Sequence, residues 1–190
     1  MKTLIVSLKI FLFFTVLTGI MYPLLVTGVV QLSMPVKANG SLISRNNKLV
    51  GSELIGQHFD SIAYFTSRPS AVSYNPLPSG GSNYGLTNAK LKHSVDSLKN
   101  QFIVFNQLDN LTAVPSEMLF ASASGLDPHI SPKAAILQVE RIVKSRKFDD
   151  GKMQLLMQSI TELSQAPQYL FLGEPRINVL MLNLKLDEIK

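Results

Sequence analysis

The chain lacks cysteine and tryptophan, and only three of its 190 residues are histidine. Without cysteine, disulfide bonds, thiolate-bound zinc and thiol catalysis are excluded. Histidine is a frequent general base and metal ligand, so few residues are available for either role. His58 and His93 do not have the spacing of a metal-ligand pair, and no HExxH, Walker A or GxSxG motif occurs. The sequence therefore predicts no metal site and no self-sufficient enzyme.

Charge is also sparse, with 18 Lys and Arg residues against 13 Asp and Glu residues and a net charge of +5. We interpret the densest basic stretch as the solvated face and C-terminal end of a helix, because cations there suit the helix dipole. A patch for acidic lipid or nucleic acid is the alternative. No nucleic-acid-binding motif accompanies the stretch, so nucleic acid is not an expected partner. Its residues are Arg141, Lys144, Arg146, Lys147 and Lys152.

One long apolar run stands near the N-terminus. Residues 10–30 carry no charge, and about 20 apolar residues suffice for a helix to cross a bilayer. The run exceeds the roughly 7–15 residues of a signal-peptide core. A cleaved signal peptide is the alternative, because Val36-Lys37-Ala38 resembles a cleavage site. We predict a transmembrane helix over residues 10–32, surrounded by membrane lipid and kinked at Pro23.

The orientation of this helix is not decided by charge, because the cations on its two flanks nearly balance. They are Lys2 and Lys9 before the run and Lys37, Arg45 and Lys48 after it. A tail of nine residues is easily left in the cytoplasm. We therefore expect residues 1–9 to be a cytoplasmic tail and residues 33–190 to form an extracytoplasmic domain.

The strand signals of that domain lie at its two ends. Residues 41–45 and 48–52 flank Asn46-Asn47, and asparagine tolerates the positive φ of a tight hairpin turn. Residues 182–186 alternate between leucine and polar side chains, which predicts a closing strand. Residues 64–88 have no period and are rich in proline, glycine and serine. Long irregular segments of this kind are uncommon in compact domains and are often functional.

Three helices are expected between these strands. Thr87 is the predicted cap of the first, whose apolar stripe recurs every three or four residues. Ser131-Pro132 begins the second, which runs to about Lys147. Asp149 or Asp150 caps the third, and Pro167 stops it. The predicted fold class is a single N-terminal transmembrane helix followed by one α/β (α+β) soluble domain. The stripe consists of Leu91, Val95, Leu98, Phe102 and Phe105.

Few side chains carry chemistry. Asp127 could orient His129, and His129 could activate Ser131 or a neighbouring serine, as in a membrane-anchored hydrolase. Two residues apart in a proline-bound turn, however, Asp127 and His129 more often satisfy local backbone groups. Gln138 and Arg141 lie on one side of the second helix, where they would bind a polar partner or be exposed.

Five segments, in this order and over nearly the whole chain, resemble the C subunit of the Kdp potassium-transporting ATPase. They are Gly-Ser-Glu-Leu-Ile-Gly-Gln at 51–57, Tyr-Phe-Thr-Ser-Arg-Pro-Ser-Ala at 64–71, Ser-Gly-Gly-Ser-Asn at 79–83, Ser-Gly-Leu-Asp-Pro-His-Ile-Ser-Pro at 124–132 and Gly-Glu-Pro-Arg-Ile-Asn-Val-Leu at 173–180. The resemblance implies a non-catalytic accessory subunit in the bacterial plasma (inner) membrane. Its implied partners are a potassium-selective A subunit, an ATP-hydrolysing B subunit and a small F subunit.

The resemblance further implies that the subunit assembles the complex and acts as a catalytic chaperone that raises the ATP affinity of the B subunit. The resemblance implies no tightly bound cofactor. Any contact with ATP would be made together with the B subunit, and potassium is the ion that the complex transports. The nucleotide contact implied by the family would fall on Gln138. An external domain cannot reach cytoplasmic ATP, so these two expectations conflict, and we give the topology more weight.

Residues 64–88 would then dock near the mouth of the channel-like subunit, since they offer backbone groups and few charges. An alternative is that they only contact their own domain. A further alternative to the accessory-subunit hypothesis is that the chain is a stand-alone exported binding domain. The residues expected to dock are Arg68, Pro69, Asn75, Ser82, Asn83, Asp127 and His129.

Overall fold

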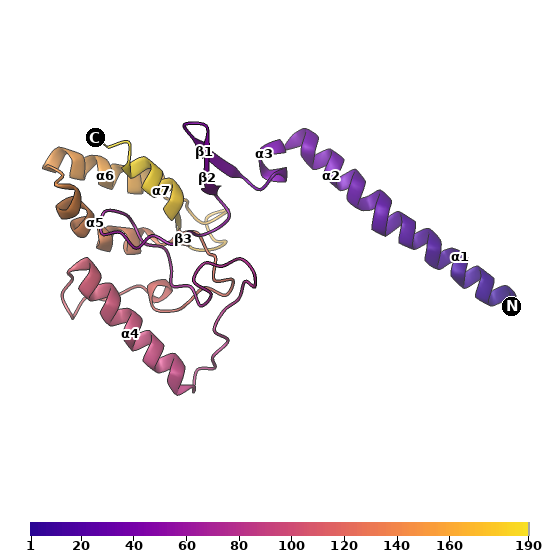
Figure 1. Cartoon of the computed structure of the whole chain (residues 1–190), viewed down its shortest axis with the longest axis horizontal. Helices are drawn as coiled ribbons and strands as arrows, with labels where there is room; N and C mark the ends of the chain where they lie inside the picture. Colours follow the sequence, from indigo (N-terminus) through magenta and orange to yellow (C-terminus); the bar gives the residue numbers. More distant parts are fainter. Residues whose placement is uncertain (190) are drawn as a thin grey trace. The chain divides into compact units, whose positions relative to one another are not determined.

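The computed structural model describes residues 1–189 and contains two compact units, which divide between Val50 and Gly51 (Figure 1). The first unit begins with a continuous helix made of α1 (Lys2–Val16), a π-helical turn (Leu17–Met21) and α2 (Tyr22–Ser33). No side chain of this helix is buried within the unit. It is the one helix among the described residues that is long and apolar enough to cross a membrane.

The apolar helix confirms the first half of the predicted fold class. It starts at Lys2, so most of the predicted tail at residues 1–9 is helical as well. The π-helical turn ends just before Pro23. A proline ring collides with the carbonyl group four residues earlier, here that of Gly19. The wider turn lies where this collision would occur.

A short helix, α3 (Pro35–Ala38), leads into the predicted hairpin of β1 (Leu42–Arg45) and β2 (Lys48–Ser52). Its two turn residues, Asn46 and Asn47, have φ values of 51° and 59°. Two successive residues with positive φ match the turn type that suits the twist of paired strands. The hairpin prediction is therefore confirmed.

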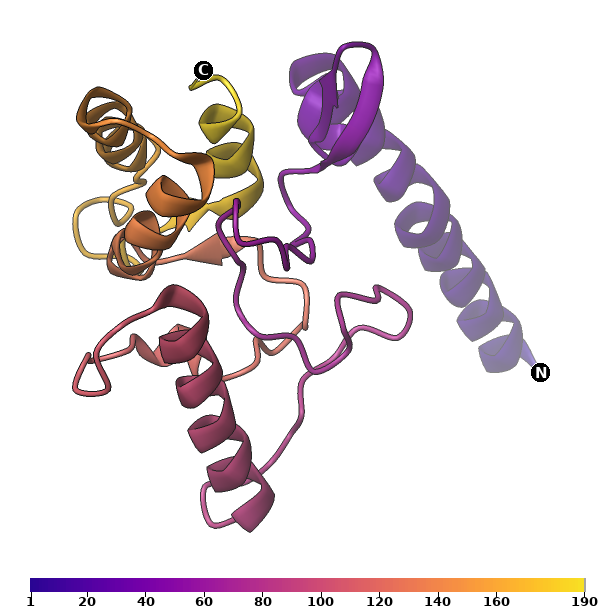
Figure 2. The same ribbon diagram turned by 60° about the vertical axis from the view of Figure 1, so that its left-hand side comes forward.

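Helices dominate the second unit, which confirms a mixed helix and strand domain (Figures 1 and 2). Its one described sheet in residues 53–189 pairs β3 antiparallel with β4, with His129 opposite Asn178 and Ile130 opposite Ile177. The N-terminal end of α4 projects away from the other helices in both views. The elements are α4 (Ala89–Asn106), a 3₁₀ turn (Ser116–Met118), β3 (His129–Ile130), α5 (Pro132–Arg146), α6 (Asp150–Glu162), β4 (Ile177–Asn178) and α7 (Val179–Leu186).

The core of this unit is formed where α5, α6 and α7 meet the C-terminal half of α4. Of the predicted stripe on α4, only Phe102 is buried, and the other four members are half-buried. Complete burial of a leucine or phenylalanine side chain stabilises a fold by about 1.5–3 kcal/mol. The core residues are Phe65, Phe102, Met118, Ile130, Ala134, Ala135, Val139, Ile142, Leu156, Ile160, Ile177, Val179, Leu182 and Leu186.

Short polar side chains begin four of these helices. Ser131 accepts a hydrogen bond from the Ala134 amide, and Asp149 accepts one from the Lys152 amide, as predicted. For α4 the cap is Asn88, so the prediction of Thr87 was wrong by one residue. Asn178 caps α7.

The predicted closing strand at residues 182–186 is wrong, because these residues belong to helix α7. Four buried side chains recur at helical spacing, which outweighs the short alternation inside the helix. These four are Val179, Leu182, Asn183 and Leu186, and Leu180 is buried as well.

Residues 61–66 form an irregular segment, buried at Phe65, whose backbone is paired by side chains in place of a neighbouring strand. Buried backbone groups must find hydrogen-bond partners. Asn183 on α7 accepts from the Phe65 amide at 2.8 Å and donates to the Phe65 carbonyl at 3.0 Å. Arg146 on α5 donates to the Ala63 carbonyl at 2.8 Å. Helices α5 and α7 thus both hold this segment through side-chain hydrogen bonds.

Gln138 and Arg141 belong to the same arrangement, which corrects the expectation that they face a partner or solvent. Gln138 is 0% exposed and Arg141 is 2% exposed. The Gln138 amide bonds both the amide and the carbonyl of Thr66, at 2.8 and 3.3 Å. Arg141 donates to several carbonyl groups, those of Ser61, Ile62 and Tyr64. The basic stretch is therefore only partly a solvated helix face.

Candidate partner-binding site

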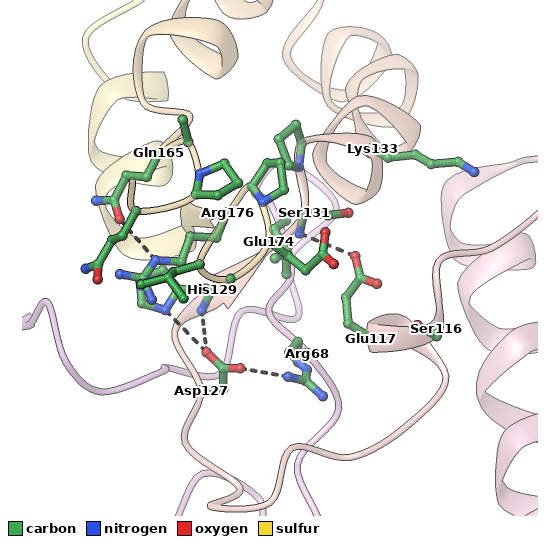
Figure 3. Close-up of a pocket in the computed structure, with 18 of the residues that line it drawn as sticks. Arg68, Ser116, Glu117, Asp127, His129, Ser131, Lys133, Gln165, Glu174 and Arg176 are labelled. Carbon is green, nitrogen blue, oxygen red and sulfur yellow. Dashed lines mark hydrogen bonds and ion pairs between the residues drawn. The ribbon is translucent and has the colours of Figure 1, made fainter. Parts of the chain in front are cut away.

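A cleft of about 1190 Å³ opens beside the start of α5 (Figure 3). Four parts of the chain line it: the segment after residue 66, the 3₁₀ turn, the loop through β3 into α5, and residues 165–176. Side chains of both charges face it. The charged lining residues are Arg68, Glu117, Asp127, Lys133, Glu174 and Arg176, with His129 among them.

Asp127 is the centre of the polar network in this cleft. Its Oδ2 atom accepts a hydrogen bond from Nη1 of Arg68 at 2.7 Å, and its Oδ1 atom accepts one from the His129 amide at 3.0 Å. Nδ1 of His129 lies 3.3 Å from the same Oδ1 atom (Figure 3). The three side chains are 24–29% exposed. They form a fixed polar surface that remains open to a partner.

The electrostatics of Asp127 follow from these contacts. Burial alone would raise the pKa of its carboxyl group. Hydrogen bonds from the side chain and backbone of His129, and the hydrogen bond and positive charge of Arg68, overcome this effect and lower the pKa to about 2. The carboxylate is consequently charged throughout the physiological range.

A pH-dependent contribution to stability follows for Asp127. A lowered pKa in the folded state stabilises the protein above the unfolded value near 4, and the stabilisation disappears as the pH falls towards 2. We expect Asp127→Asn to lower the free energy of unfolding by about 1–2 kcal/mol at pH 7, allowing for partial exposure. The difference from the unmodified chain should vanish near pH 2, as followed by circular dichroism. Asp96→Asn, at an exposed position on α4, is the control; a difference independent of pH would contradict the expectation.

Two glycines allow the segments around the cleft to approach closely. The Gly56 amide donates to the Leu126 carbonyl at 2.7 Å, and a Cβ atom on Gly56 would lie 2.7 Å from the Asp127 carbonyl oxygen. Gly125 has a φ of 70°, and a Cβ there would lie 2.9 Å from the Gly80 oxygen. Both glycines lie in segments that carry the family resemblance, Gly56 in residues 51–57 and Gly125 in residues 124–132.

The residues expected to dock do not all meet. Arg68, Asp127 and His129 come together in the cleft. Pro69 lines a different groove, of about 630 Å³, beside α4. The remaining three, Asn75, Ser82 and Asn83, are exposed on the irregular segment. That segment is anchored at Gly80, whose amide donates to the Ser124 carbonyl at 3.0 Å.

The hydrolase arrangement is not formed. The hydroxyl oxygen of Ser131 accepts from the Ala134 amide at 3.1 Å as the cap of α5, and the Ser131 amide donates to Glu117 at 3.3 Å. Within residues 1–189 no hydrogen bond joins the His129 ring to Ser131. In the same part of the chain, no group of three or more His, Asp or Glu side chains is placed to hold a metal ion.

Several cleft residues were missed by sequence reasoning. Glu174 and Arg176 stand within a motif that carries the family resemblance, so a signal for them existed. Arg176 is held by Gln165 through a side-chain hydrogen bond of 3.1 Å (Figure 3). Glu117 and Lys133 lie outside those motifs, and nothing in the sequence marks them.

The chain is similar to known proteins over nearly its full length. The sequence profile of the family described as "K+-transporting ATPase, c chain" matches residues 4–188. A protein of Leptospira interrogans is 44% identical over 182 residues, covering 96% of this chain and 92% of the relative. One from Photorhabdus laumondii is 44% identical, covering 96% and 94%, and one from Koribacter versatilis is 45% identical, covering 98% and 94%. Each of the three is named "Potassium-transporting ATPase KdpC subunit".

Proposed function

Because this chain belongs to the family of the c chain of the K+-transporting ATPase, we propose that it is a non-catalytic accessory subunit that assembles and stabilises such a complex. Its apolar N-terminal helix anchors it in the bacterial plasma membrane, with the tail inside and the domain outside. Its partners are a potassium-selective A subunit, an ATP-hydrolysing B subunit and a small F subunit.

The cleft supports this proposal most directly. Arg68, Asp127 and His129 hold one another in place and leave their outer edges accessible. The groups with which a hydrolase would act are occupied: the Ser131 hydroxyl by the helix cap, and the Nδ1 side of His129 by Asp127. Fixed charges of both signs on an open surface are suited to recognising a protein partner. In this proposal the cleft and the exposed loop residues Asn75, Ser82 and Asn83 face the A subunit.

An effect on ATP affinity of the B subunit belongs to the same proposal, acting through the assembled complex. The Gln138 amide is fully buried, and its oxygen and nitrogen atoms are engaged by Thr66 and Arg141. Direct contact with a nucleotide would require these bonds to break. Transmission through the membrane helix or through the shape of the A subunit needs no such opening.

The decisive experiment is recovery of the complex with a tagged copy of the full chain. The chain would be purified in mild detergent from potassium-starved bacterial cells, and co-purifying proteins would be identified by mass spectrometry. We expect a channel-like protein and a P-type ATPase. Arg68→Ala and Asp127→Asn should each lower their recovery several-fold, whereas Lys90→Ala on the exposed start of α4 should not. Purification of the unmodified chain alone, while the partners are expressed, would refute the proposal.

A further inference from the structure

Residues 165–176 form a small apolar finger at the edge of the cleft. The strand-like pairing of Gln165 with Arg176 closes its base, and that of Gln168 with Leu172 closes its tip. Backbone hydrogen bonds of 2.8–3.1 Å join the first pair in both directions, and bonds of 2.9 Å join the second pair in both directions. The side chains of Gln165 and Arg176 also bond each other (Figure 3).

The tip of the finger presents large apolar side chains to solvent. Tyr169 is 80% exposed, Leu170 is 90% exposed and Phe171 is 77% exposed. No charged residue occurs from Leu163 to Gly173. Single exposed apolar residues are normal, but a contiguous cluster of aromatic and aliphatic side chains marks an interaction site.

The tip of the finger also has an unusual backbone conformation. Tyr169 and Leu170 have φ values of 53° and 72°. For bulky side chains the left-handed region costs about 1–2 kcal/mol per residue. Such strain persists where the surrounding structure enforces it, and it is concentrated at functional sites. Here the bridge between Gln168 and Leu172 closes the turn that contains both residues.

The surroundings of the finger distinguish a protein partner from a lipid surface. Its base borders the cleft, where three cations, Arg68, Lys133 and Arg176, balance three carboxylates, those of Glu117, Asp127 and Glu174. Segments that bind a membrane surface combine apolar residues with an excess of cations. An apolar centre bordered by polar groups of mixed charge is the anatomy of a protein interface.

We propose that Tyr169, Leu170 and Phe171 are the anchor residues of the interface with the channel-like A subunit, and that they insert into an apolar pocket on its extracytoplasmic surface. This inference rests on the proposed function, since it assigns the apolar centre of the interface whose polar part is the cleft. Aromatic anchors that fill a pocket supply most of the affinity of many interfaces. A preshaped finger loses little conformational freedom on binding.

The first test places a photoreactive benzoyl-phenylalanine at position 171 of the full chain, co-expressed with its partner subunits. Irradiation of the intact membranes, followed by mass spectrometry, identifies the attached molecule. We expect an adduct with the channel-like subunit and none from the same probe at position 111, where Leu111 is 92% exposed in the turn after α4. An adduct with lipid, or no adduct, would overturn the inference.

The second test measures affinity with Leu170→Ser and, as its matched control, Leu111→Ser. We expect at least a tenfold lower recovery of the partner subunits for Leu170→Ser and no change for Leu111→Ser. Thermal unfolding of the chain should be the same for both variants, because neither side chain lies in the core. Equal recovery of the partner subunits with both variants would overturn the role of the finger but leave the proposed function standing. Failure of the unmodified chain to recover partners overturns the proposed function itself.

Discussion

Replacing Arg141 with methionine is expected to lower the free energy of unfolding of the second unit by about 4 kcal/mol. Each buried acceptor left without a donor costs about 1–3 kcal/mol, and Arg141 serves several. Its Nε atom donates to Asn106 at 2.9 Å and its Nη2 atom to the Tyr64 carbonyl at 2.9 Å. The guanidinium group also lies 4.5 Å from the centre of the Phe105 ring.

The charge and shape of the Arg141 guanidinium explain why lysine cannot fully replace it. Burial lowers the pKa of its guanidinium to about 10, so the group is still protonated at neutral pH. The hydrogen-bond partners described for it are all neutral oxygen atoms, those of Asn106, Ser61, Ile62, Tyr64 and Gln138. The planar group with five donors reaches all of these, whereas a lysine has three donors at one point. Arg141→Lys should therefore recover only part of the loss.

Thermal unfolding of the full chain in mild detergent, followed by circular dichroism, measures this effect. Lys144→Met is the matched control, because Lys144 is exposed on the same helix and pairs with Glu140 at the surface. Domains of this size have a total stability of about 5–15 kcal/mol, so Arg141→Met should remain folded but unfold at a markedly lower temperature. A loss below about 1 kcal/mol would show that residues 61–66 do not depend on Arg141.

How far the sequence predicts this fold depends on how local each signal is. The hairpin follows from Asn46 and Asn47 alone, and the starts of α5 and α6 follow from Ser131 and Asp149, whose side chains cap within three residues. Helix α7 was misread because five residues of alternation are too short to separate a strand from a helix. Including Asn178 as a cap and Val179 as the first buried residue would have indicated the helical period.

The candidate site was predictable where motifs mark it and not where distant segments meet. Asp127 and His129 are neighbours in sequence, and their pairing was expected. Their contact with Arg68, 59 residues away, depends on the folded loop. Likewise, the polar character of Gln138 and Arg141 suggested exposure, because a sequence gives no sign of an unpaired backbone segment beside a helix. The need of residues 61–66 for hydrogen bonds explains both burials.

Substitutions of Gln138 distinguish most clearly between a structural role for this residue and its contact with a nucleotide. We expect Gln138→Ala to cost about 3 kcal/mol, because the backbone groups of Thr66 and one Arg141 donor lose their partner in a fully buried place. Recovery of the complex should fall with stability. Any loss of ATP affinity should then be proportional to the loss of assembled complex.

Gln138→Glu is the informative companion, since a carboxylate of the same shape still accepts from Thr66 and gains an ion pair with Arg141. The bond to the Thr66 carbonyl, 3.3 Å long, becomes a repulsive contact between two oxygen atoms, which the ion pair with Arg141 offsets. We expect this variant to assemble and to retain the ATP affinity of the complex, measured as the ATP dependence of hydrolysis. A negative charge placed against nucleotide phosphates would instead weaken ATP binding at least tenfold. That outcome in an intact complex would assign Gln138 to the nucleotide and contradict its role as the partner of residues 61–66.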